Sequence, residues 1–408
     1  MMKIAGERLW QRLMQMAQIG AIPGEGVNRQ ALSREEEESW QLMQHWAQES
    51  QLEICGDAAG NLFVTLPGVD RQAAPLLLGS HLDSQPTGGR FDGVYGVLAA
   101  LEVLTVLRES GWQPRCDVVA VSWMNEEGSR FAPGMMGSSW FAGARDLAAI
   151  HAVADASGVT VGEALAAIRQ RMPLSVWRGS WPPAAYLEAH IEQATVLEKT
   201  GATIGVVSGI QGKVTWQVTL HGERGHAGTV PMKERRDVLR SFTRIAQQLY
   251  QVTGDADPEV MFTIGRVEMQ PNAPSVIPDN LTFRIDLRHP QEPMLTALAA
   301  QIEQIMNALA APCLVVISRL SEAAPNTFDP RLQQMIAGSA RERGYPAMPL
   351  LSAAGHDARY LAAICPAAMI FIPCRAGISH APEEWSEPEQ VCAGAQVLLD
   401  VAVKWLGG

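Results

Sequence analysis

Residues 74–110, "APLLLGSHLDSQPTGGRFDGVYGVLAALEVLTVLRES", form the stretch that decides the fold class. The stretch begins with a short, dense apolar run, which is typical of a buried β-strand. It ends with apolar residues at helical spacing. The glycine-rich loop between the two carries His81, Asp83 and Asp92. A strand, a polar loop and a helix in this order indicate one unit of an α/β fold.

A histidine and two carboxylates in one loop require an explanation, because a protein core does not bury such groups without partners. Three interpretations are open at this point. The loop is solvated, it is a hydrogen-bonded structural turn, or it is a metal site.

Three further stretches combine a buried apolar run with acidic or histidine residues at its end. They are "CDVVAVSWMNEEG" (116–128), "AYLEAHIEQ" (185–193) and "AAMIFIPCRAGISH" (367–380). Strands that alternate with helices indicate an α/β domain with a central, mostly parallel sheet. The carboxyl ends of the strands are the edge at which such a sheet binds ligands.

The middle of the chain has a different pattern. In "KVTWQVTLHG" (213–222) and "LTFRIDLRHP" (281–290), apolar and polar residues alternate, which predicts strands with one buried face. With the helices and strands that surround them, the order is β-α-β-β-α-β, that of a ferredoxin-like α+β domain. We predict that residues 212–325 form this domain, inserted into a catalytic domain of residues 1–211 and 326–408.

The composition limits the class of partner. The formal net charge is -11, which disfavours nucleic acid because phosphates require a basic surface. The cysteines include no C-x-x-C pair, which is typical of reduced thiols in a cytoplasmic protein. Residues 1–20 predict an amphipathic helix and not a signal peptide, and no apolar run is long enough to cross a bilayer. We therefore expect a cytoplasmic protein without a membrane or nucleic-acid partner.

Imidazole and carboxylate groups at the predicted strand ends are suitable ligands for Zn²⁺, with Mn²⁺, Co²⁺ or Ni²⁺ as alternatives. The candidate ligands are His81, Asp92, Glu127, His190 and His380. A single histidine after a strand is usually structural, but the coincidence of all these motifs at strand ends favours a metal site. Asp83, two residues after His81, is placed to accept a hydrogen bond from the other ring N–H of that histidine.

The adjacent acids Glu126 and Glu127 allow two roles at one strand end. Neighbouring residues in an extended chain point in opposite directions, so one can bind metal while the other faces the substrate. We assign Glu127 to the metal and Glu126 to proton transfer as the general base. A solvated acidic loop would be the better interpretation if the pair stood alone.

Other chemistries have little support in the sequence. It contains no G-x-S-x-G elbow, P-loop or G-x-G-x-x-G motif. The segment "GERGHAGT" (222–229) lacks the lysine and spacing of a phosphate-binding loop. Its His226 is instead a polar group at the tip of the inserted domain.

The chain resembles the dinuclear-zinc amidohydrolases that include N-carbamoyl-L-amino-acid hydrolase, β-ureidopropionase and allantoate amidohydrolase, relatives of the aminoacylase-like and carboxypeptidase-like metallopeptidases. The motifs that carry the resemblance follow one another along nearly the whole chain. They are "GSHLDSQPTGGRFDGVYGVLAALEVL", "NEEGSRF", "AHIEQ", "IGVVSGIQG", "GHAGTVPMKERRD", "QPNAPSVIP", "DLRHP", "AAGHDA" and "GISHAPEE".

The resemblance implies a zinc-peptidase-like catalytic domain and a lid domain that also dimerises. It implies two divalent metal ions per subunit, bridged by Asp92. His81 and His190 would complete one metal site, and Glu127 and His380 the other. The peptidase relatives usually carry a carboxylate where this chain has His190, which indicates the carbamoyl-cleaving branch.

The resemblance also implies a set of substrate-binding residues. These are Gln193, His226, Asn272, Arg288 and the backbone of Gly355. The planar fork of Arg288 suits a substrate carboxylate, and His226 would reach the site from the partner subunit as an oxyanion donor. Lys213 stands where several relatives carry Gln, which disfavours allantoate and adds a charge to the pocket.

We therefore predict a homodimeric hydrolase that cleaves the carbamoyl C–N bond of N-carbamoyl-L-amino acids or N-carbamoyl-β-alanine and releases ammonia, carbon dioxide and the amino acid. The first alternative is an allantoate amidohydrolase or another N-acyl amino acid amidohydrolase. The second alternative is an inactive binding protein on the same fold.

Overall fold

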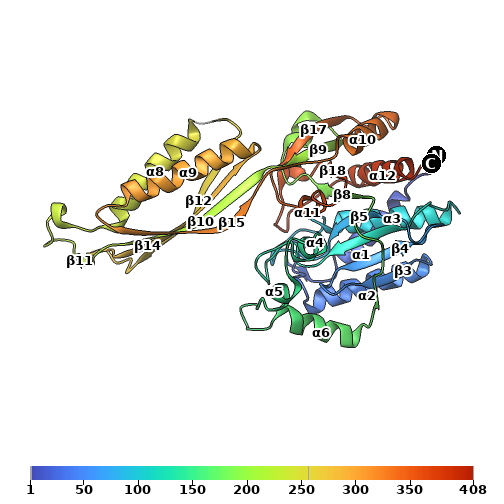
Figure 1. The fold of residues 1–408 in the computed structure, drawn as a ribbon, viewed down its shortest axis with the longest axis horizontal. Helices are drawn as coiled ribbons and strands as arrows, with labels where there is room; N and C mark the ends of the chain where they lie inside the picture. The colour runs from blue at the N-terminus through green and yellow to red at the C-terminus, as the bar shows by residue number, and fades with distance from the viewer. Residues whose placement is uncertain (1, 256, 408) are drawn as a thin grey trace. The chain divides into compact units, whose positions relative to one another are not determined.

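The computed structural model describes residues 2–255 and 257–407 and divides into two compact units (Figure 1). The first unit comprises Met1–Gly209 and Thr327–Gly408, and the second comprises Ile210–Asn326. The second unit is thus a single continuous segment, and both chain ends belong to the first.

A ten-stranded sheet forms the centre of the first unit, in the order β16-β9-β18-β8-β5-β6-β4-β3-β7 with β17 paired to β9. The strands are β3 (Glu53–Gly56), β4 (Leu62–Leu66), β5 (Leu76–His81), β6 (Val118–Trp123), β7 (Ser175–Val176), β8 (Ala185–Ile191), β9 (Ile204–Ile210), β16 (Asn326–Thr327), β17 (Ala347–Ser352) and β18 (Ala367–Ile372). A separate hairpin joins β1 (Ala21–Ile22) to β2 (Gly26–Val27).

The four central strands, β18, β8, β5 and β6, are mutually parallel, whereas β4 and β9 run antiparallel beside them. Every residue of these four central strands is buried, which is expected of a parallel sheet covered on both faces. The predicted α/β fold with a central, mostly parallel sheet is confirmed.

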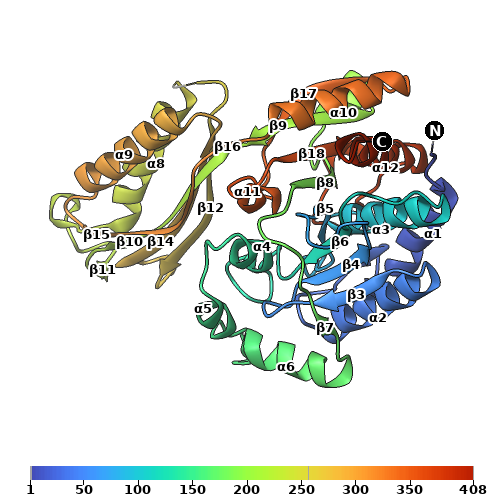
Figure 2. The ribbon, with the colours of Figure 1, turned by 45° about the vertical axis from the view of Figure 1, so that its right-hand side comes forward.

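Helices cover this sheet. They are α1 (Gly6–Met16), α2 (Arg34–Glu49), α3 (Val94–Glu109), α4 (Met136–Phe141), α5 (Leu147–His151), α6 (Val161–Arg171), α7 (Val196–Thr200), α10 (Pro330–Glu342), α11 (Ala358–Leu361) and α12 (Pro388–Trp405), with a 3-10 turn at Arg375–Gly377. Helix α3 packs on β5, β6 and β8, and α1 and α12 pack on α3 (Figure 2). Leu9, Leu13 and Met16 give α1 the buried face that the sequence predicts.

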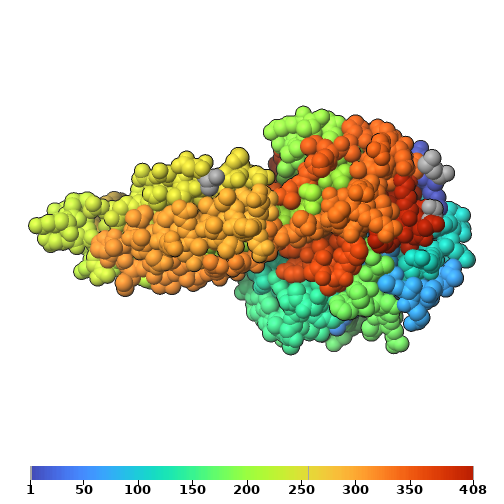
Figure 3. Space-filling model, turned by 45° about the horizontal axis from the view of Figure 1, so that its top comes forward, coloured from blue at the N-terminus to red at the C-terminus, as the bar shows by residue number. Residues whose placement is uncertain are grey.

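Helices α10 and α12 lie side by side at the surface of the first unit (Figure 3, orange and red). Lys404 of α12 donates to a carboxylate oxygen of Glu342 at 2.7 Å. Arg343, the residue after Glu342, forms a second ion pair with Asp400 at 2.6 Å. These pairs fasten the last helix to the one before it.

The second unit is a four-stranded antiparallel sheet in the order β12-β14-β10-β15, with two long helices. Its elements are β10 (Gly212–His221), β11 (Gly225–His226), a 3-10 turn (Met232–Glu234), α8 (Val238–Gly254), β12 (Met261–Gln270), β13 (Val276–Ile277), β14 (Asn280–His289), α9 (Glu292–Leu309) and β15 (Leu314–Ala323). This is the ferredoxin-like order expected from the sequence.

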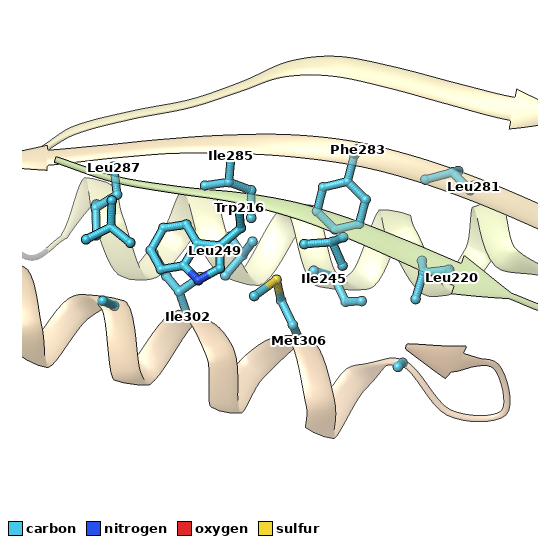
Figure 4. Packing of buried hydrophobic residues seen from close by; sticks show 14 of the residues in the cluster. Trp216, Leu220, Ile245, Leu249, Leu281, Phe283, Ile285, Leu287, Ile302 and Met306 are labelled. Atoms are coloured by element: carbon cyan, nitrogen blue, oxygen red, sulfur yellow. The ribbon is translucent and has the colours of Figure 1, made fainter. Parts of the chain in front are cut away.

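One face of that sheet packs on α8 and α9 and forms a separate hydrophobic core (Figure 4). Trp216 of β10 and Phe283 of β14 point from the sheet toward the helices. They share this core with Ile245 of α8 and Ile302 of α9. Burial along β10 alternates strictly, as its sequence predicts, because successive side chains point to opposite faces.

Within residues 2–255 and 257–407, no helix combines the length and apolar character that a bilayer crossing requires. Each of the six cysteines is free.

Candidate metal centre and active site

His81 is the last residue of β5, and its side chain is buried. Its Nδ1 lies 2.9 Å from the backbone oxygen of Asp83. Its Nε2 lies 3.6 Å from Asp92 and 3.6 Å from Glu126, in each case to a carboxylate oxygen. When Nδ1 carries the proton and donates to the carbonyl, Nε2 presents a lone pair to these acids, as a metal ligand must.

The prediction for Asp83 is corrected in one respect. Its backbone oxygen, not its carboxylate, is the hydrogen-bond partner of His81, whose Nδ1 lies 3.7 Å from the carboxylate. The buried carboxylate instead accepts hydrogen bonds from the backbone N–H groups of Glu126 at 3.1 Å and Glu127 at 3.2 Å. Asp83 therefore fixes the glutamate turn directly.

Asp92 follows the glycine-rich loop and precedes the start of α3. Its Oδ1 lies 3.1 Å from Nε2 of His190, and its Oδ2 lies 3.2 Å from Nε2 of His380. Gly93, the N-cap of α3, has a φ of 67°, and a Cβ there would lie 2.3 Å from Cε1 of His81. Only glycine fits this position, where the turn brings the Asp92 carboxylate beside the histidines.

Glu126 and Glu127 follow β6 in a turn and not in extended chain. The predicted reason for the divergence of their side chains, that neighbouring residues of an extended chain point in opposite directions, is therefore wrong. Asn125, with a φ of 55°, lies in this turn directly before Glu126. Glu126 nevertheless lies beside His81, whereas a carboxylate oxygen of Glu127 lies 3.5 Å from Nε2 of His380. Gln85 donates to Glu127 through both its backbone N–H and its side-chain amide.

The two remaining histidines come from different settings. His190 is the penultimate residue of β8, is buried, and has its Nδ1 2.9 Å from the backbone oxygen of Ile191. His380 lies eight residues beyond the end of β18, in a loop where its φ is 57°, and its side chain is 48% exposed. The chain must therefore leave β18 and turn back before His380 reaches Asp92.

These contacts define two groups of candidate metal ligands that share Asp92. His81, Asp92 and His190 form one group, and Asp92, Glu127 and His380 form the other. The donors in each are imidazole nitrogen and carboxylate oxygen, the set preferred by Zn²⁺ and similar divalent ions. The backbone N–H of Gly93 donates to Nε2 of His190 at 3.1 Å, so that nitrogen carries a lone pair. The residues present therefore fit divalent metal ions.

The electrostatics of the site also favour bound cations. Burial raises the pKa of Glu126 well above its usual range, and it raises the pKa of Glu127 to about 7. Burial also disfavours ionised Asp92, but the histidines outweigh it and hold the pKa of that carboxyl well below its usual range. The hydrogen bond to Asp92 raises the pKa of His380 to about 9. Several carboxylates crowded out of water are stabilised by a positive charge between them.

The profile of the peptidase family M20/M25/M40 matches residues 77–404, a range that includes all the candidate ligands. The chain belongs to this family. Members of the M20 family are metal-dependent, which agrees with the two ligand groups.

Relatives of this M20 chain extend over its full length. It is 37% identical over 406 residues to an N-carbamoyl-L-amino-acid amidohydrolase of Rhizobium meliloti, covering 98% of this chain and 97% of that protein. It is 33% identical over 396 residues to an allantoate amidohydrolase of Bacillus subtilis, covering 95% of each. A crystal structure of an amidase of the hydantoinase/carbamoylase family from Burkholderia multivorans superposes with a TM-score of 0.91 at 39% identity, covering 100% of this chain and 99% of that one.

Two of the predicted substrate residues belong to the first unit of the M20 chain. Gln193 donates through Nε2 to Asp92 at 2.7 Å and to the hydroxyl of Ser379 at 3.0 Å, so it lies at the site. Gly355 lies close to Met135, because a Cβ at Gly355 would be 3.0 Å from the terminal methyl group of that methionine.

The other predicted substrate residues belong to the second unit. Arg288 donates through Nε and Nη2 to the two carboxylate oxygens of Asp286, and Lys213 pairs with the same carboxylate at 3.1 Å. The fork expected to bind a substrate carboxylate thus has a partner within the protein. His226 is exposed on β11, where its Nδ1 accepts from the N–H of Gly228. Asn272 is exposed with a φ of 54°.

Glu384 was not anticipated as a site residue. Its Oε1 accepts from the backbone N–H groups of Phe91 at 2.8 Å and Asp92 at 3.0 Å, and burial raises its pKa to about 8. Ser379 also escaped prediction, although its hydroxyl donates to Asp92 at 2.7 Å. Both residues lie within the motif "GISHAPEE", so their proximity to His380 was the available signal.

Proposed function

We propose that this chain is a metal-dependent amidohydrolase that cleaves the ureido C–N bond of N-carbamoyl-L-amino acids or N-carbamoyl-β-alanine. One water is consumed, and the products are the free amino acid, ammonia and carbon dioxide. The substrate class is supported by relatives named N-carbamoyl-L-amino-acid amidohydrolase from Rhizobium meliloti and Geobacillus stearothermophilus, at 37% and 36% identity.

The observation that carries the proposal is the position of Asp92 between two ligand groups, with Glu126 beside them. Two divalent ions per subunit would be held there, one by His81, Asp92 and His190 and the other by Asp92, Glu127 and His380. Zn²⁺ is the first candidate, with Mn²⁺, Co²⁺ or Ni²⁺ as alternatives. Such ions supply Lewis acidity, which activates water and polarises a carbonyl group.

Glu126 is the general base of the proposed reaction. It accepts a proton from the attacking water and returns it to the leaving nitrogen. Its carboxylate lies 3.6 Å from Nε2 of His81, which places it directly beside the first ligand group. Asp83 acts through Glu126 by holding the backbone of the turn.

The remaining roles concern the substrate. In this proposal Arg288 binds its carboxylate with the support of Lys213, and Gln193, Asn272 and the backbone of Gly355 orient its ureido group. His226 donates a hydrogen bond to the carbonyl oxygen, where negative charge develops. The ferredoxin-like unit acts as a lid and dimerisation domain, and His226 serves the site of the partner subunit in a cytoplasmic homodimer.

Allantoate hydrolysis is the second candidate function. It is supported by the allantoate amidohydrolases of Bacillus subtilis and Escherichia coli, each 33% identical to this chain. Lys213 beside Arg288 adds a positive charge that favours a different acid. An inactive binding protein is disfavoured, because the ligand groups and Glu126 are all present.

A substrate panel tests the proposal. Purified protein is loaded with Zn²⁺ or Mn²⁺ and assayed for ammonia release from N-carbamoyl-β-alanine, several N-carbamoyl-L-amino acids and allantoate. We expect the highest kcat/KM on an N-carbamoyl amino acid. We expect no turnover of any substrate after metal removal. The Glu126→Gln variant is the matched control for contaminating activity. A preference for allantoate selects the second candidate, and no turnover of any substrate contradicts both.

A further inference from the structure

The second unit contains a buried histidine whose surroundings are unlike the rest of its core. His289 is the last residue of β14 and continues the buried face formed by Phe283, Ile285 and Leu287. Its side chain is 0% exposed, and its Nε2 has no hydrogen-bond partner among the residues that the structure describes. A buried polar atom without a partner is costly, so this nitrogen requires an explanation.

Two carboxylates lie close to the His289 ring. Asp257 and Glu259 lie in the segment between α8 and β12, and each places an oxygen within 4.8 Å of the other and of a His289 nitrogen. The Oδ2 of Asp257 is 3.9 Å from Nε2 of His289. This separation is too long for a hydrogen bond. It leaves room for an ion that both atoms bind, because two metal–ligand bonds of about 2.0–2.2 Å reach across it at a wide angle.

The other ring nitrogen of His289 is compatible with a metal ligand. Nδ1 lies 3.0 Å from the N–H of Gln291 and 3.2 Å from its carbonyl oxygen. If Nδ1 accepts from the N–H, then Nε2 carries a proton that is buried without an acceptor. If Nδ1 donates to the carbonyl, then Nε2 presents a lone pair toward Asp257. Metal-binding histidines commonly have this second arrangement.

The helix that precedes the segment adds negative potential. Helix α8 ends at Gly254, and its carbonyl end carries the negative part of the helix dipole. Asp257 lies three residues after Gly254. Its side chain accepts a hydrogen bond from the backbone N–H of Glu259 at 2.8 Å, which holds the two acids in one turn. A cation is therefore favoured by the dipole, by both carboxylates and by the imidazole.

We propose that His289, Asp257 and Glu259 bind one divalent transition-metal ion, with Zn²⁺ as the best match to one nitrogen and two oxygen donors. Water completes the coordination on the exposed side of Glu259. This site lies wholly within the second unit, and it uses none of the ligands grouped around Asp92. The ion joins the segment before β12 to the end of β14, so its role is structural.

Zinc counting on the full-length chain tests the proposal. Wild type and the double variant Asp257→Asn/Glu259→Gln are dialysed against graded free Zn²⁺, and bound zinc is measured by mass spectrometry. We expect the double variant to bind one ion fewer per chain, with at least about 10-fold weaker binding, since loss of even an outer partner costs a metal site about 10–100-fold. Hydrolytic activity should remain, because these residues lie outside the catalytic groups.

Two comparisons make the result specific. Glu268→Gln is the matched control, because Glu268 is an exposed acid of β12 that pairs with Arg266, and it should leave the zinc count unchanged. Asp92→Ala removes the residue that both ligand groups share, so this variant should keep only the ion at His289. That ion should be lost in the triple variant Asp92→Ala/Asp257→Asn/Glu259→Gln. This outcome does not depend on whether the proposed hydrolysis is correct. Equal zinc counts with and without Asp257 and Glu259, in folded protein, would overturn the site.

Discussion

The carboxylate of Asp83 accepts a hydrogen bond from the backbone N–H of Glu126 at 3.1 Å. A second bond, from the N–H of Glu127 at 3.2 Å, ends on the other oxygen of the same carboxylate. One buried acid therefore orients both members of the glutamate pair, the proposed base and the proposed metal ligand. Because Asp83 also bonds to His81 through its backbone oxygen, it couples the ends of β5 and β6.

Asp83→Asn should lower kcat with little change in KM. An asparagine side chain offers one acceptor oxygen, so one of the two N–H groups would face a donor instead of an acceptor. We expect a loss of about 10–100-fold, the usual cost of removing an outer partner from a metal site. Steady-state kinetics and metal content measure the effect. Asp117→Asn is the matched control. Asp117 precedes β6 at the end opposite to the glutamates, and its carboxylate also accepts from a backbone N–H, that of Gly68. Wild-type turnover in Asp83→Asn would remove Asp83 from the positioning role.

Glu126→Gln and Glu127→Gln should fail in different ways. Glu126→Gln removes the proton acceptor and should reduce kcat by about 10²–10⁴-fold while both metal ions are retained. Glu127→Gln removes a candidate ligand and should lower the metal content instead. Metal analysis beside single-turnover kinetics separates the two outcomes. If Glu126→Gln loses metal and Glu127→Gln keeps it, the two roles must be exchanged.

Much of the fold follows from local patterns in the sequence. The continuous apolar runs of β5 and β6 and the alternation in β10 correspond to buried and half-buried strands, because burial on two faces or on one face directly sets the pattern. The same runs indicate the positions of His81, which ends β5, and of Glu126, which lies three residues after β6. Parallel strands then bring their carboxyl ends to one edge of the sheet.

The site contacts that could not be predicted from the sequence are made by irregular loops. His380 reaches Asp92 only because eight residues after β18 turn back, and Glu384 accepts from N–H groups that lie 293 and 292 residues earlier in the chain. The carboxylate of Asp83 meets a turn more than 40 residues away. No periodicity encodes these contacts, because they depend on how separate loops pack together.

Removal of metal should abolish hydrolysis, and divalent ions should restore it. The donor set around Asp92 would hold the ions that activate the attacking water in the proposed reaction. Protein dialysed against a chelator and checked for metal content should be inactive, and titration with Zn²⁺, Mn²⁺, Co²⁺ or Ni²⁺ should recover turnover. The recovery should require about two ions at the Asp92 centre. Full activity in protein shown to lack metal would exclude this mechanism.

Arg288→Lys should raise KM for carboxylate substrates by at least about 10-fold, since hydrogen bonds to charged groups contribute about 1.5–3 kcal/mol. Lysine keeps the charge but loses the planar fork, which Asp286 now orients through two hydrogen bonds. A neutral amide analogue of the substrate should be affected much less. Arg284→Lys is the matched control, because Arg284 lies on the same strand and bonds to Gln217. Equal effects on the charged and neutral substrates would place Arg288 outside the pocket.

Mixing two inactive variants should restore activity if His226 acts across a dimer. His226 is exposed on β11 in the inserted unit, so its side chain is accessible to a second subunit. A heterodimer of Glu126→Gln and His226→Ala subunits would contain one site with both defects and one site with neither. Each heterodimer should therefore recover about half of the wild-type rate, since closed two-fold dimers have two equivalent sites.

The exchange of subunits must be demonstrated for this result to be informative. Differently tagged chains, purified in two steps, isolate the heterodimer and allow its rate to be measured directly. Glu126→Gln mixed with itself provides the baseline, because every site in that dimer lacks the base. His221→Ala is the matched control for His226→Ala, because His221 ends β10 in the same unit and forms a hydrogen bond with Asn280. Its homodimer should stay active. If the isolated heterodimer has no activity, His226 acts within its own subunit or takes no part in catalysis, and the shared site is excluded.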